Sequence, residues 1–161
     1  MPMTAIEIGV VLERRPARSA WLDVIWEARS VLPEPAAAER GAPLGATASG
    51  ELFYAGAARL EVNTIDTGYY RDNLESGTPQ IWVVLRPQDS GLPEIARVTC
   101  DPNEGEGYAG SGWNIVNVVP MPAPIAAALA AFVAEHHVDR PFIKRKRDKA
   151  DSQALASARQ G

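Results

Sequence analysis

Alternation of apolar and polar residues with a period of two recurs along this chain and does most to limit how it folds. Residues 5–13 (AIEIGVVLE) place Ile6, Ile8 and Val10 on one side of an extended backbone, which is typical of a half-buried strand. Residues 24–32 (VIWEARSVL) alternate in the same way. We expect these two segments to pair as a hairpin, because a polar stretch that contains Pro16 separates them.

Further segments have strand character. Residues 51–65 (ELFYAGAARLEVNTI) alternate beyond Gly56, which predicts a bent strand or a hairpin around that glycine. Residues 80–86 (QIWVVLR) are apolar on both faces, as expected of a central strand that is covered on both sides. Residues 94–100 (EIARVTC) and 113–119 (WNIVNVV) are two more predicted strands.

Two segments have helical character. In residues 66–77 (DTGYYRDNLESG), Thr67 is a candidate N-cap, and Gly77 stands where a left-handed cap would end the helix. Residues 121–138 (MPAPIAAALAAFVAEHHV) begin with prolines and repeat apolar residues at the helical period. The predicted buried stripe of this second helix consists of Ile125, Ala128, Leu129, Phe132, Val133 and His136.

These segments predict an α+β fold. We expect a mainly antiparallel, twisted sheet or a partly closed barrel of about six or seven strands, with one short helix and the long C-terminal helix packed on it. A parallel α/β fold is disfavoured because helices do not alternate with the strands. A chain of 161 residues with 46% hydrophobic content can bury one core. Residues 1–143 are therefore predicted to form a single domain, in which residues 33–50, rich in Pro, Gly and Ala, are a mobile loop.

The charge of the chain is divided unequally along its length. Residues 1–138 contain nine Arg, no Lys and 17 Asp or Glu, a net charge of −8, whereas residues 139–161 contain seven Lys or Arg and three Asp, a net charge of +4. We predict that residues 144–161 form a disordered basic tail, which is either solvated or docks on the acidic body or on an acidic partner. Specific nucleic-acid binding is disfavoured because the acidic body would repel phosphate.

The residues that could carry chemistry form no catalytic or metal-binding pattern. Cys100 is predicted to be a buried structural cysteine, and the DPNEGEG stretch after it to be a glycine-rich turn without the spacing of a calcium loop. His136 is predicted to be packed and His137 to be solvated, with side chains that diverge too far to share a metal. Nucleotide-binding, zinc-protease and hydrolase fingerprints are missing. We assign no catalytic residue, metal or cofactor, and an enzyme that uses Cys100 or His136 is the weakest functional hypothesis.

The sequence also bears on the compartment. A single cysteine fits a reducing environment. The N-terminal MPMTAIEIGVVLERRP is predicted to be a strand and not a signal peptide. No apolar run approaches the roughly 18 residues that a membrane span needs. We expect a cytoplasmic, soluble protein with no membrane span.

Two stretches, LFYAGAARLEVNTIDTGYYRDNLESGTPQIWVVLRP and VPMPAPIAAALAAFVAEHHVDRPFIKRKRDKAD, resemble the bacterial domain-of-unknown-function family 3305. The likeness runs over nearly the whole chain and is weakest in residues 33–50. The resemblance carries no catalytic residues onto this sequence, because the family has none assigned. Its members look like small cytoplasmic proteins that are often encoded near formate dehydrogenase subunits and molybdenum-cofactor genes, which implies an accessory role in producing that enzyme.

The resemblance also implies that the basic segment RPFIKRKRDKAD is a recurring part of the protein. Pro141 is expected to end the helix, and Phe142 with Ile143 to form a hydrophobic latch before the charge begins. A short apolar anchor followed by cations suits an acidic protein surface. The predicted partner-docking residues are Phe142, Lys144, Arg145, Lys146, Arg147 and Lys149.

The leading hypothesis is a non-enzymatic accessory or adaptor protein that aids maturation or assembly of a molybdenum-dependent formate dehydrogenase through protein–protein contacts. Its expected partner is a formate dehydrogenase subunit or maturation factor with an acidic surface. The alternative is a small-molecule or cofactor-binding module with a pocket between the sheet and the C-terminal helix. A surface patch of exposed Trp or Tyr favours the first hypothesis, and a deep pocket with convergent polar groups favours the second.

Overall fold

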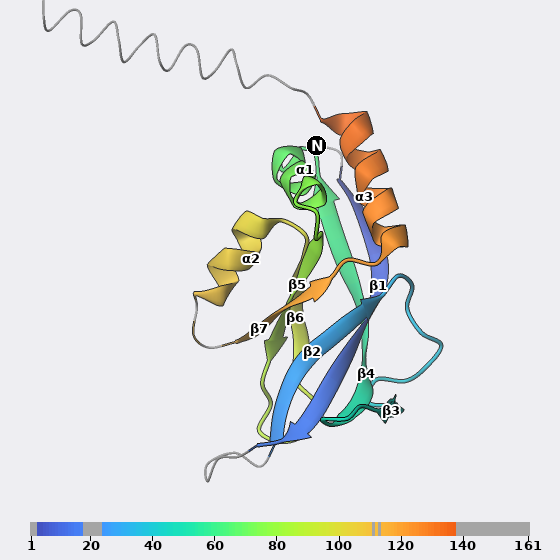
Figure 1. The fold of residues 1–161 in the computed structure, drawn as a ribbon, viewed down its shortest axis with the longest axis vertical. Helices are drawn as coiled ribbons and strands as arrows, with labels where there is room; N and C mark the ends of the chain where they lie inside the picture. The colour runs from blue at the N-terminus through green and yellow to red at the C-terminus, as the bar shows by residue number, and fades with distance from the viewer. Residues whose placement is uncertain (1–2, 18–23, 111, 113, 138–161) are drawn as a thin grey trace, which may run out of the picture.

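The computed structural model describes residues 3–17, 24–110, 112 and 114–137. These residues form two antiparallel sheets and three helices (Figure 1). The strands are β1 (Met3–Pro16), β2 (Val24–Leu32), β3 (Pro43–Ala46), β4 (Glu51–Asn63), β5 (Gln80–Arg86), β6 (Glu94–Thr99) and β7 (Ile115–Pro120). The helices are α1 (Thr67–Glu75), α2 (Pro102–Ala109) and α3 (Ala123–His136). The predicted α+β class with mainly antiparallel strands is confirmed.

The strands are divided between two sheets and do not close into a barrel. The order is β2-β1-β4-β3 in the four-stranded sheet and β6-β5-β7 in the three-stranded sheet. The sheets approach one another at two places, where β2 lies beside β7 and β4 lies beside β6. All of the pairings within the sheets are antiparallel, including the predicted β1–β2 pairing. The predicted central position of β5 is also found, between β6 and β7.

The hydrophobic core lies between the two sheets and α3. Alternate residues of the strands point inward, as the period of two predicts, and the helix contributes one side. Fully buried members of this core are Ile8, Leu12, Leu60, Ile81, Val83, Leu85 and Leu129. The predicted stripe of α3 is confirmed for Ile125, Leu129, Phe132 and Val133. Ala128 differs, because it is exposed beside a groove instead of buried in the core.

Gly56 allows β4 to bend without ending. Its φ of 115° is a backbone conformation that residues with a side chain rarely adopt. The register between β1 and β4 shifts at the same level, between Val10 and Val11. Of the two predicted alternatives, the single bent strand is therefore the one that forms.

The segment predicted as a loop over residues 33–50 contains the short strand β3, which pairs with the start of β4. The backbone of Tyr54 exchanges hydrogen bonds with this segment, accepting from the Gly41 amide at 2.7 Å and donating to the Ala42 carbonyl at 2.9 Å. The Tyr54 hydroxyl also accepts from the Ala36 amide at 3.0 Å. The sequence did not predict this pairing with β4, because residues 33–50 have no alternating pattern of apolar and polar residues.

The turn predicted for DPNEGEG is wrong, because these residues form most of α2. The Asp101 side chain accepts hydrogen bonds from the backbone amides of Asn103 and Glu104, and Pro102 occupies the first turn. Asp followed by Pro, with Glu three residues after Asp, is a helix-start signal that outweighs the two glycines. The N-cap predicted for α1 is also displaced by one residue, to Asp66.

Candidate functional site

A groove separates α3 from the sheet beside it. Its walls are the start of β1, the end of β4 and the C-terminal half of α3, and its volume is about 440 Å³. The alanines of α3 are too small to fill this space. The lining residues are Met3, Thr4, Ile6, Val62, Ala128, Ala131, Phe132, Glu135 and His136. This is the place where the alternative hypothesis expects a pocket between the sheet and the C-terminal helix.

Large apolar side chains are exposed in three segments near one end of the molecule, and one of them, Met3, lines this groove. Met3 is 62% exposed, Ile65 69% and Tyr69 45%. Met3 pairs with Asn63 at the end of β4, and Ile65 and Tyr69 follow in the turn into α1 and in its first turn. Figure 1 shows the start of β1, α1 and the last turn of α3 at the same end of the molecule. We refer to Met3, Ile65 and Tyr69 as the apolar end.

The two histidines have different surroundings. His136 lies partly buried with its ring 4.5 Å from that of Phe132, and its Nε2 is 3.7 Å from a Glu135 carboxylate oxygen. The packed position predicted for His136 agrees with this geometry. The prediction that His137 is solvated is wrong, because its Nδ1 lies 2.9 Å from the buried Thr67 hydroxyl. The helix ends at His136, and the extended backbone of His137 turns its ring toward α1.

Cys100 is fully buried, as predicted. Burial raises the pKa of its thiol to about 12, so the group is protonated at neutral pH and lacks the thiolate that a nucleophile requires. Its backbone carbonyl accepts a hydrogen bond from the Asn73 side chain at 3.0 Å, which ties α1 to the end of β6. The surroundings of Cys100 are those of a core residue.

A polar network that the sequence did not reveal joins α2 to β6 and β4. The Arg97 guanidinium donates to Glu104 at 2.8 Å and to Glu61 at 3.1 Å, and the Thr99 hydroxyl donates to Glu104 at 2.7 Å. Burial alone would raise the pKa of Glu104, but the hydrogen bonds from Arg97 and Thr99 outweigh it and lower that pKa. Because these donors and carboxylates form hydrogen bonds with one another, the network holds α2 and β4 to β6. Of its members, only Glu104 belongs to a recognisable local pattern, the helix-start signal in which it follows Asp101 by three residues.

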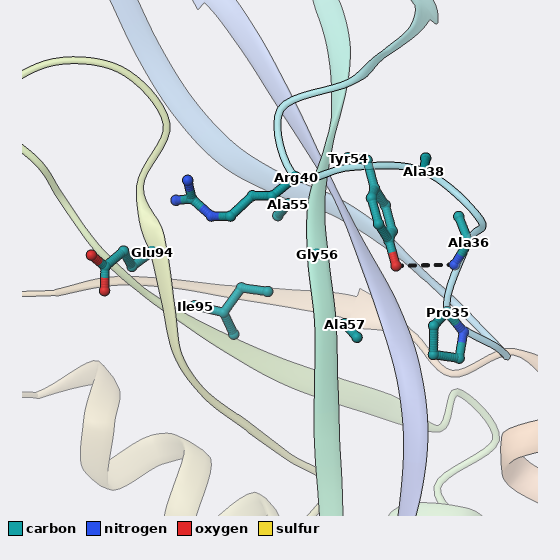
Figure 2. Close-up of a pocket in the computed structure, with 10 residues that line it drawn as sticks. All are labelled: Pro35, Ala36, Ala38, Arg40, Tyr54, Ala55, Gly56, Ala57, Glu94 and Ile95. Carbon is teal, nitrogen blue, oxygen red and sulfur yellow. Dashed lines mark hydrogen bonds between the residues drawn. The ribbon is translucent and has the colours of Figure 1, made fainter.

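Figure 2 shows a second, shallower cleft, of about 700 Å³, between the 33–50 segment and the start of β6. Arg40 extends toward the β6 side, where its guanidinium donates to the Leu92 and Pro93 carbonyls at 3.3 and 2.8 Å. Tyr54 points the other way and accepts from Ala36. Both polar side chains are engaged in fastening the 33–50 segment to the sheets. The cleft is therefore explained by the packing of this segment.

The sequence profile of the family described as "Protein of unknown function (DUF3305)" matches residues 7–146. The chain belongs to this family. The matched range covers all of the described helices and extends beyond α3 as far as Lys146, so the DUF3305 profile includes the beginning of the basic segment. Comparison with curated proteins and with solved structures finds no match.

The partner-docking residues predicted from the sequence, Phe142, Lys144, Arg145, Lys146, Arg147 and Lys149, lie outside the residues that the structure describes. Their role stays a prediction. Within residues 3–17, 24–110, 112 and 114–137, no group of three or more His, Cys, Asp or Glu is placed to hold a metal ion. The helices of this DUF3305 chain, over the same residues, are all too short or too polar to cross a membrane.

A buried carboxylate fastens the 33–50 segment to β1. Glu13 is fully buried and accepts hydrogen bonds from the Thr47 hydroxyl and, at 2.9 Å, from the Ser49 hydroxyl. The guanidinium groups of Arg15 and Arg29 lie 3.8 and 3.9 Å from its other oxygen. The hydrogen bonds from Thr47 and Ser49, with the charges of Arg29 and Arg15, hold the pKa of Glu13 below its usual value.

Glu13 should make the stability of the protein sensitive to acid. Because its pKa is lowered by folding, the stabilisation is present above the unfolded pKa, near 4.5, and is lost as the pH falls through the folded value. Glu13→Gln should lower the free energy of unfolding at pH 7 by about 1–2 kcal/mol, with a smaller loss at pH 3. Urea unfolding at both pH values measures this. The control Glu51→Gln, at an exposed ion pair with Arg14, should change stability by less than about 1 kcal/mol; an equal effect of both variants would contradict the assignment.

Proposed function

We propose that this protein is a non-enzymatic, cytoplasmic accessory protein that docks on a partner protein. In this proposal the apolar end forms the hydrophobic contact, and residues 144–149 of the basic segment form the electrostatic one. The partner is a formate dehydrogenase subunit or a maturation factor for that enzyme, following the gene neighbourhood that the family resemblance implies. The protein would then aid maturation or assembly of the molybdenum-dependent enzyme.

The exposure of Met3, Ile65 and Tyr69 together at one end is the observation that carries the proposal. Scattered exposed apolar residues are common on soluble proteins, but several large ones at one end of a molecule are typical of an interaction surface. The aromatic Tyr69 is of a type enriched in protein interfaces.

The charge of the chain supports an acidic partner for the basic segment. The body, residues 1–138, has a net charge of −8, so it would repel an acidic partner unless the contact is made by the segment of opposite charge. Residues 144–149 contain five cations, and they follow α3 after a short interval. The apolar end and the point where α3 leads into the basic segment are at the same end of the molecule (Figure 1), so one partner surface can engage both.

The alternative is that the α3 groove holds a small molecule or cofactor. Its volume of about 440 Å³ lies within the range of ligand pockets. Its polar groups are fewer than its apolar ones and lie at one end, where Glu135 and His136 contact each other. A ligand in this groove would cover Phe132 and Ala131. Its binding would not depend on Ile65 or Tyr69.

Binding to purified formate dehydrogenase subunits from the same host tests the proposal. We expect capture by the intact protein that weakens as salt rises, because the Debye length shrinks from about 10 Å at 0.1 M to about 3 Å at 1 M. Truncation after Ile143 and the double variant Ile65→Ser with Tyr69→Ser should each reduce capture without unfolding the protein. Leu44→Ser, at an exposed apolar residue of β3, is the matched control and should bind normally. Unchanged capture by both test variants would refute docking through this end.

A further inference from the structure

A third hollow, separate from the apolar end, lies where β2 of one sheet meets β7 of the other. It is formed between β2, β7 and the loop of residues 87–93 that connects β5 to β6, and its volume is about 750 Å³. This size is within the range of pockets that bind small molecules. The lining residues are Val24, Ile25, Trp26, Glu27, Pro87, Gln88, Asp89, Ser90, Gly91, Pro93, Ile115 and Asn117. We refer to this hollow as the inter-sheet cleft.

The apolar wall of the inter-sheet cleft is held in place from behind. The Trp26 ring packs edge-on against Phe53, with centroids 5.7 Å apart and an interplanar angle of 61°. The Arg14 guanidinium lies 5.7 Å from the same Trp26 ring and 4.6 Å from that of Phe53. Trp26 is only partly buried, so part of the fixed ring remains available to a ligand. A wall that is already ordered binds at a lower entropic cost.

The polar groups of the cleft are of two kinds. The Asn117 side-chain oxygen accepts from the Ala28 amide at 2.7 Å, which fixes the amide and leaves its NH₂ group as a donor. Among the residues that the structure describes, the lining contains two carboxylates, Glu27 and Asp89, and no Lys or Arg. Glu27 is bound by Arg15 at 2.7 Å, whereas Asp89 forms no ion pair with another residue of the described part of the chain. Within the described part of the chain, the cleft therefore presents the Asp89 carboxylate without an ion-pair partner beside an apolar wall.

We propose that the inter-sheet cleft binds a small apolar molecule that carries a positive charge, such as an aromatic or aliphatic amine. The hydrocarbon part of the ligand packs against Trp26, Val24 and Ile115, and the ammonium group faces Asp89. An ammonium group is favoured over a neutral or anionic one because the opposite charge of Asp89 attracts it and no described lining residue is a cation.

A pair of probes with the same ring and opposite charge tests the proposal. Titration calorimetry of the intact protein would compare 2-naphthylmethylammonium with naphthalene-2-sulfonate. We expect the ammonium probe to bind roughly five- to tenfold more tightly, since the charges interact across partly solvated space. Asp89→Asn should remove most of this preference, because Asp89 is exposed and its replacement does not disturb the core. Absence of binding by both probes, or tighter binding of the sulfonate, would overturn the proposal.

Variants that fill the cleft locate the binding. Val24→Trp, at a lining residue that is 39% exposed, should weaken binding of the ammonium probe at least roughly tenfold. Val118→Trp is the matched control, because Val118 is similarly exposed, at 44%, and does not line the cleft. It should bind the probe as the unaltered protein does. If both variants weaken binding of the probe equally, or if neither weakens it, the probe binds elsewhere and the inter-sheet cleft is rejected as its site.

Discussion

Replacing Phe132 with alanine is expected to lower the free energy of unfolding by about 3–5 kcal/mol. Phe132 is buried in α3 and belongs to the core between the helix and the two sheets. Its removal leaves a cavity and also takes away the ring that His136 contacts. Because a whole domain is stable by only about 5–15 kcal/mol, much of the protein would unfold at moderate temperature.

Thermal and urea unfolding of Phe132→Ala measure this effect directly. Ala127→Ser is the matched control on the exposed side of the same helix, and it should alter stability by no more than about 0.5 kcal/mol. A melting temperature that is the same for Phe132→Ala and the unaltered protein would mean that α3 is not docked on the sheets.

A second large effect is expected from adding one methyl group at Gly105. A Cβ at this position would overlap the ring of Trp82, which is buried and donates from its Nε1 to Glu106 at 3.1 Å. Either α2 or the indole must move, and overpacking of this kind costs about 1–3 kcal/mol or more. Gly105→Ala should therefore destabilise the protein and shift the fluorescence of Trp82, because the ring changes its surroundings.

Gly107→Ala offers a matched control two residues away in the same helix. A Cβ at Gly107 meets no atom within 4 Å, so alanine should stabilise the protein by about 0.5–1 kcal/mol through its higher helix propensity. The two substitutions are chemically the same but have opposite expected signs. If both stabilise the protein, α2 does not pack on Trp82 in the way described.

The sequence predicted the elements whose pattern is local. Period-two alternation located β1, β2 and β4 closely, because each of these strands has one face in the core. Strand β5 was located by its run of apolar residues on both faces, because both of its faces are covered. The stripe of α3 was predicted for the same reason, since a helix that packs on one side repeats its apolar residues every three or four positions. Strand β3 has four exposed residues, so it has no burial pattern to detect.

The candidate sites were less accessible to sequence reasoning. The sequence analysis predicted where the α3 groove would lie. The exposure of Met3, Ile65 and Tyr69 at one end of the molecule depends on where β1 starts relative to α1. The inter-sheet cleft unites residues from β2, from the 87–93 loop and from β7, which are distant in the chain. His137 was predicted to be solvated, because the pattern gives no sign that α1 would supply the Thr67 hydroxyl.

The sequence by itself determined the α+β class, most of the strands, the buried stripe of α3 and the separation of a basic segment from an acidic body. These properties depend on residue type and short-range spacing, which the order of the residues contains directly. The tertiary structure alone decided the division into two sheets, the burial of Glu13 beneath Thr47 and Ser49, and the network of Arg97 with Glu61 and Glu104. Each of these depends on contacts between residues far apart in the chain, whose free energy is set by the geometry of packing and not by any local pattern.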